Sequence, residues 1–84
     1  MSSRIDYPLD NALRDLEKFF KAHIKDKNSR ESLLHYLETC KKSNKLGFRY
    51  LHEALMKYRR DFSDYFEYSE SEKQMIDDLF YFWE

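Results

Sequence analysis

Glycine, proline and cysteine each occur only once in this chain of 84 residues, as Gly47, Pro8 and Cys40. β-Sandwiches and β-barrels need turn-forming residues at short intervals, so the scarcity of glycine and proline argues against both folds. A single cysteine cannot form an internal disulfide, which fits a reducing compartment. We therefore expect an all-α protein of the cytoplasm.

Long apolar runs are also missing from the sequence. No stretch approaches the roughly 18 consecutive apolar residues that indicate a transmembrane helix, and no charged and then apolar leader resembles a signal peptide. The formal net charge is only −1, so no bulk charge draws the chain to nucleic acid or to an anionic membrane. A chain this short has room for one core, and we expect one helical domain over residues 1–84, without membrane contact.

Four segments have the spacing of apolar side chains that is typical of amphipathic helices. Pro8 suits the first turn of the first segment. Ser69 with Glu72 and Ser71 with Gln74 each have the spacing of a capping box at the start of the last one. The third segment could bend near Asp61, which leaves open whether it is one helix or two. The sequence predicts a compact bundle of three to four antiparallel helices, at approximately 7–26, 29–42, 47–67 and 71–83.

The predicted core consists of residues that lie at the centre of these apolar faces. A small bundle buries such side chains first, because they point at the neighbouring helices. Eight residues meet this criterion: Leu13, Leu16, Phe20, Leu33, Leu37, Leu51, Leu55 and Leu79.

Two groups of side chains contain residue types that can bind a metal or act in catalysis, and neither predicts catalysis. Glu31, His35 and Glu38 share one helix face, but a metal site usually takes ligands from a second element as well, so we interpret them as solvated. Cys40 and His23 would form a nucleophilic pair only beside an orienting group. The sequence has no glycine-rich phosphate loop, Cys-x-x-Cys pair or nucleophile elbow. We expect no enzymatic activity, no cofactor and no metal.

Charge is distributed unevenly along the chain. Residues 1–60 contain 14 Lys and Arg against 8 Asp and Glu, whereas residues 61–84 contain 1 against 8. A basic stripe with helical spacing in the first segment could follow the phosphates of a nucleic acid, although neighbouring carboxylates weaken its field. Nucleic-acid binding by this stripe is therefore the alternative function, and its residues are Arg14, Lys18, Lys21 and Lys25.

The last 24 residues contain 8 of the 15 aromatic side chains and 8 of the 16 Asp and Glu residues of the chain. Chain ends usually fray, so this aromatic end must be held against a surface. On a helix, Phe80 and Tyr81 project about 100° and 200° away from Leu79, and one flat contact cannot bury all three. We expect Leu79 to face the bundle, with Phe80 and Tyr81 turned toward another chain or another part of the fold.

The sequence thus favours a small protein-interaction module, such as an adaptor, a regulator or an inhibitor subunit. Aromatic anchors surrounded by carboxylates suit a basic partner or a second copy of the chain. The candidate partner-binding residues are Tyr65, Tyr68, Phe80, Tyr81 and Trp83.

Overall fold

The computed structural model describes residues 6–63 and 67–83, and within these ranges the chain forms α-helices and no β-strand. This confirms the all-α fold class. The helices are α1 (Leu9–His23), α2 (Lys27–Ser43), α3 (Phe48–Asp61) and α4 (Glu70–Trp83).

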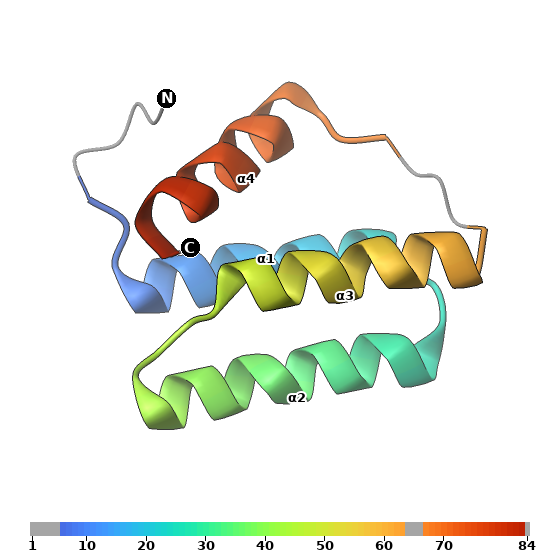
Figure 1. Cartoon of the computed structure of the whole chain (residues 1–84), viewed down its shortest axis with the longest axis horizontal. Helices are drawn as coiled ribbons and strands as arrows, with labels where there is room; N and C mark the ends of the chain where they lie inside the picture. The colour runs from blue at the N-terminus through green and yellow to red at the C-terminus, as the bar shows by residue number, and fades with distance from the viewer. Residues whose placement is uncertain (1–5, 64–66, 84) are drawn as a thin grey trace.

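The helices form an antiparallel arrangement in which α1 is central (Figure 1). α2 runs antiparallel to α1, and α3 returns in the direction opposite to α2. α4 crosses back on the side of the bundle away from α2, where it packs against α1 and α3. One face of α1 is thus covered by α2 and another by α4.

The reversal between α1 and α2 differs from the prediction, which extended the first helix to residue 26 and began the second at 29. α1 ends at His23 because Ile24 takes an extended backbone conformation, which places its side chain in the core. Asp26 then caps α2: its Oδ2 atom accepts a hydrogen bond of 2.9 Å from the backbone N–H of Ser29. α2 therefore begins at Lys27.

The start of α1 is also later than predicted. Pro8 occupies the N-cap position, and its carbonyl oxygen accepts the hydrogen bond from the N–H of Ala12. Tyr7 lies outside the helix and is buried. Its hydroxyl group donates a hydrogen bond of 2.5 Å to the Oδ2 atom of Asp15, which lies in α1.

α3 is a single helix, but it is shorter than the predicted 47–67. It begins at Phe48 and ends at Asp61, and Ser63 has a left-handed backbone with a φ of 52° that an α-helix cannot continue. Residue 67 is also outside a helix, while residues 64–66 lie outside the described part of the chain. The prediction followed the apolar spacing through Phe62, which the backbone at Ser63 interrupts.

The start of α4 has the capping box of Ser69 and Glu72, one of the two that the sequence predicted. The hydroxyl group of Ser69 accepts a hydrogen bond of 3.2 Å from the N–H of Glu72, and the Glu72 carboxylate accepts one of 2.8 Å from the N–H of Ser69. Both partners of the box are thus satisfied, and α4 begins at Glu70, one residue before the predicted 71.

The core confirms the sequence prediction, since all eight predicted residues are buried. Further residues that complete it come from the helices and from the connections between them. They are Tyr7, Ala12, Phe19, Ile24, Cys40, Leu46, Phe48 and Tyr58.

Tyr58 connects α3 to the reversal between α1 and α2. Its side chain is buried, and its hydroxyl oxygen lies 3.2 Å from the backbone nitrogen of Lys25 and 3.4 Å from that of Asp26. Arg30 holds the same reversal from α2, because its Nη1 atom donates a hydrogen bond of 3.1 Å to the carbonyl oxygen of Ile24. The turn is therefore stabilised by the two helices that follow it.

Candidate interaction surface

Tyr68, the first candidate anchor that the structure describes, belongs to the fold of its own chain. Its ring centroid lies 5.6 Å from that of Phe19, and Nη1 of Arg59 donates a hydrogen bond of 3.3 Å to its hydroxyl group. Tyr68 thereby fastens the segment before α4 to α1 and α3. Tyr65 lies outside the described residues.

Phe80 makes the connection between α4 and α3. Its ring packs edge-on against Phe48, with centroids 4.8 Å apart, and against His52, with centroids 4.9 Å apart. Burial in this cluster lowers the pKa of His52, and the charge of Arg59 acts in the same direction. Of the two expected surroundings for Phe80, the structure shows the second, another part of the fold.

Trp83 fastens the end of α4 to the segment before α1. Its indole Nε1 atom donates a hydrogen bond of 2.8 Å to the carbonyl oxygen of Tyr7. The neighbouring Phe82 packs edge-on against the Tyr7 ring, with centroids 6.4 Å apart. The aromatic end is thus held against the bundle, as the sequence predicted.

Tyr81 differs from the other three described candidates, because 68% of its surface is exposed. Its ring contacts Phe82 edge-on, with centroids 4.8 Å apart, and otherwise points away from the core. It ends a stripe of exposed residues along α4 that we call the α4 outer face. This face consists of Glu70, Lys73, Gln74, Asp77 and Tyr81.

Among the described residues two further aromatic side chains are exposed, and neither was predicted to bind a partner. Tyr50 lies beside Tyr36 of α2, with ring centroids 5.5 Å apart, and Phe62 stacks on Tyr58 with centroids 5.0 Å apart. Both rest on residues of their own chain with one face. Phe62 had the spacing of a core residue, but α3 ends at Asp61, directly before it, where the sequence left a bend open.

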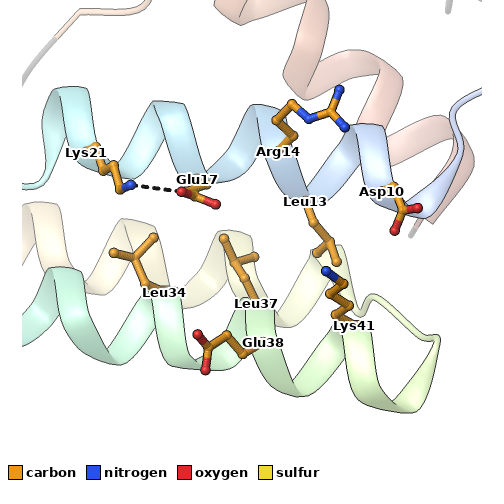
Figure 2. Close-up of a pocket in the computed structure, with 9 residues that line it drawn as sticks. All are labelled: Asp10, Leu13, Arg14, Glu17, Lys21, Leu34, Leu37, Glu38 and Lys41. Atoms are coloured by element: carbon orange, nitrogen blue, oxygen red, sulfur yellow. Dashed lines mark hydrogen bonds and ion pairs between the residues drawn. The ribbon is translucent and has the colours of Figure 1, made fainter.

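The basic stripe borders a groove between α1 and α2 with a volume of about 560 Å³ (Figure 2). Arg14 and Lys21 line it, whereas Lys18 lines a separate pocket between α1 and α4, and Lys25 lies in the turn after α1. All four predicted side chains are exposed. The structure therefore does not gather the four into one continuous face.

Carboxylates alternate with cations in this groove. Nζ of Lys21 lies 2.8 Å from Oε1 of Glu17, and the hydrogen bond and charge of Lys21 lower the pKa of that carboxyl group. The charged lining consists of Asp10, Arg14, Glu17, Lys21, Glu38 and Lys41. A groove with equal numbers of cations and carboxylates gives no net attraction to a phosphate backbone.

The structure separates the two residues of the possible nucleophilic pair and leaves the three residues of the possible metal site exposed. His23 ends α1 and its Nε2 atom lies 2.6 Å from Oε2 of Glu72, whereas Cys40 is buried in the last turn of α2, toward the opposite end of the bundle. Glu31, His35 and Glu38 are exposed on α2. Over residues 6–63 and 67–83, no three His, Cys, Asp or Glu side chains are arranged to hold a metal ion.

No helix in the described part of the chain is long and apolar enough to cross a membrane. Comparison with protein-family models, with curated proteins and with solved structures found no match to this chain.

Proposed function

We propose that this protein is a small interaction module that binds a basic segment of another protein through the α4 outer face. The observation that carries the proposal is the position of Tyr81, a large aromatic side chain that is 68% exposed on a helix whose other aromatic residues pack inward. Tyrosine is one of the residue types that contribute most to binding energy when a partner covers them.

Charge next to Tyr81 indicates the kind of partner. Asp77 lies one helical turn before Tyr81, and both side chains are exposed. At the other end of the face the Nζ atom of Lys73 lies 3.5 Å from Oε1 of Glu70, so these two charges partly neutralise each other. An arginine or lysine of the partner would therefore meet the carboxylate of Asp77 and the face of the Tyr81 ring together, which favours a cation through both ion pairing and cation–π attraction.

The role that follows is that of an adaptor, a regulator or an inhibitor subunit. Such a protein acts by occupying a surface, and the rigid attachment of α4 through Phe80 and Trp83 supports this role. A helix that is already held in place loses little conformational freedom on binding, so more of the contact energy appears as affinity.

Affinity purification from the native cell with matched variants tests the proposal. We expect the wild-type chain and Tyr50→Ala to retain the same partner protein, and Tyr81→Ala and Asp77→Lys to lose it. Tyr50 is the control because it is exposed to a similar extent, 65% against 68% for Tyr81. With the purified partner, titration calorimetry should show a loss of about 1–3 kcal/mol for Tyr81→Ala. Equal retention by all four proteins would contradict the proposal.

A further inference from the structure

The charges along the groove between α1 and α2 follow a regular order. On α1 they read Asp10, Arg14, Glu17 and Lys21, so that the sign alternates negative, positive, negative, positive. At 100° per residue these four positions lie within an arc of about 60°, which forms a single stripe along the helix. All four side chains are exposed.

This order is complementary to itself when a second copy of the stripe runs in the opposite direction. Asp10 of one copy then faces Lys21 of the other, and Arg14 faces Glu17. Every contact joins opposite charges, and because such a pair has two-fold symmetry each contact occurs twice. In a parallel pairing with the same register, each of the four residues would meet its own charge, which is unfavourable.

α2 contributes two further charged side chains and part of the apolar lining of the groove. Glu38 and Lys41 line the other side of the groove with opposite charges. Figure 2 shows Leu13, Leu34 and Leu37 pointing into the space between the two helices. Leu34 is only half-buried in the monomer, so a covering chain would bury more of its surface.

We propose that the groove between α1 and α2 is an antiparallel self-association surface, and that its occupant is the same groove of a second copy of this chain. The proposal is independent of the α4 outer face, which lies on the other side of α1. α1 has 15 residues and is therefore about 22 Å long, so the contact is short. We expect a weak and reversible dimer.

Analytical ultracentrifugation of the wild-type chain from about 10 μM to about 1 mM is the first measurement. We expect the average mass to rise with concentration from 10.4 kDa toward twice that value. Salt should reduce the association, because the contacts are exposed ion pairs. A mass that stays at 10.4 kDa over the whole range would overturn the proposal.

A pair of charge-reversal variants tests the predicted contacts directly. Arg14→Glu with Lys21→Glu makes the α1 stripe entirely acidic, and Asp10→Lys with Glu17→Lys makes it entirely basic. We expect each variant alone to be monomeric and an equimolar mixture to form heterodimers, with a dissociation constant at least about 10-fold below that of either variant alone. Because these residues are exposed, the variants should keep the helical circular dichroism of the wild type.

The matched control separates the groove from bulk charge. Arg49→Glu with Lys57→Glu carries the same net charge as the acidic-stripe variant, but both of its substitutions are exposed on α3, outside the groove. We expect this control to self-associate like the wild type and to form no heterodimer with the basic-stripe variant beyond the wild-type level. Equal binding of the basic-stripe variant to the control and to the acidic-stripe variant would show that net charge, and not the order of charges, drives association.

Discussion

The indole nitrogen of Trp83 donates a hydrogen bond to the carbonyl oxygen of Tyr7, at 2.8 Å, across 76 positions of sequence. This contact joins the last turn of α4 to the segment that precedes α1. Phe82 packs on the ring of the same tyrosine. Three aromatic side chains, those of Tyr7, Phe82 and Trp83, thus close the bundle at one end.

Trp83→Phe removes the hydrogen bond and keeps an aromatic ring. We expect the free energy of unfolding to fall by about 0.5–1.5 kcal/mol, because the carbonyl oxygen of the buried Tyr7 loses its donor. Urea unfolding followed by circular dichroism measures the change. Tyr81→Phe is the control and should alter stability by less than about 0.5 kcal/mol, since its hydroxyl group is on an exposed side chain.

Leu37→Ala and Leu55→Ala should each lower the free energy of unfolding by about 2–5 kcal/mol. Both leucines are buried, in α2 and α3 respectively, and the truncation leaves a cavity. A domain of this size has little stability to lose, so either variant is expected to melt far below the wild type. Lys57→Ala on the exposed side of α3 serves as the reference, and an equal melting temperature for Leu55→Ala would contradict the assignment of the core.

His52 should make the protein less stable as the solution becomes mildly acidic. Burial against Phe48 and Phe80 lowers its pKa from the ordinary value of 6.5, so the unfolded chain binds a proton more readily than the folded one. Stability is therefore complete above pH 6.5 and decreases as the pH falls below that value. Urea unfolding at several pH values between about 7.5 and 5 should show a smaller decrease for His52→Leu than for the wild type.

Glu72 should contribute stability that is lost in acid. Burial alone would raise its pKa, but the hydrogen bonds from the Ser69 backbone and from His23 outweigh it and lower the pKa from 4.5. The stabilisation is therefore present above pH 4.5 and disappears as the pH falls through the lower value in the folded chain. At neutral pH we expect Glu72→Gln to be less stable by a few tenths to about 1 kcal/mol, and the difference from the wild type to shrink as the pH falls below 4.5. Glu70→Gln, on a side chain that is 94% exposed, should show no such convergence.

Replacing Lys18, Lys21 and Lys25 together with Gln tests the alternative function. We expect stability to change by less than about 1 kcal/mol, because all three side chains are exposed. We also expect neither protein to bind DNA or RNA in an electrophoretic mobility assay. Binding by the wild type that weakens steeply with salt and is lost in the triple variant would favour a nucleic-acid function.

The parts of the fold that follow from local sequence were predictable. Leu13, Leu37 and Leu79 each lie at the centre of an apolar helix face, and a small bundle has no other use for such a face. Ser69 and Glu72 have the fixed spacing of a capping box, as do Ser71 and Gln74, so the start of the last helix could be predicted to within one residue.

The ends of α1 and α3 were less predictable, because they depend on contacts that are distant in sequence. Ile24 leaves α1 to enter the core, and the turn that follows is held by Tyr58 of α3. Likewise the outward direction of Tyr81 follows from helix geometry, whereas the contact of Phe80 with Phe48 depends on how α4 lies on α3. Helical periodicity gives directions around an axis, but not the neighbour that each direction meets.

The hydroxyl group of Tyr58 has a consequence for the modularity of the fold. It lies within hydrogen-bonding distance of two successive backbone N–H groups in the turn between α1 and α2, and it is supplied by a helix that comes later in the chain. A fragment that ends after α2 would lack this acceptor for the N–H groups of Lys25 and Asp26. The α1–α2 hairpin is therefore not a transplantable unit, and a graft of its groove onto another scaffold would have to carry α3 with it.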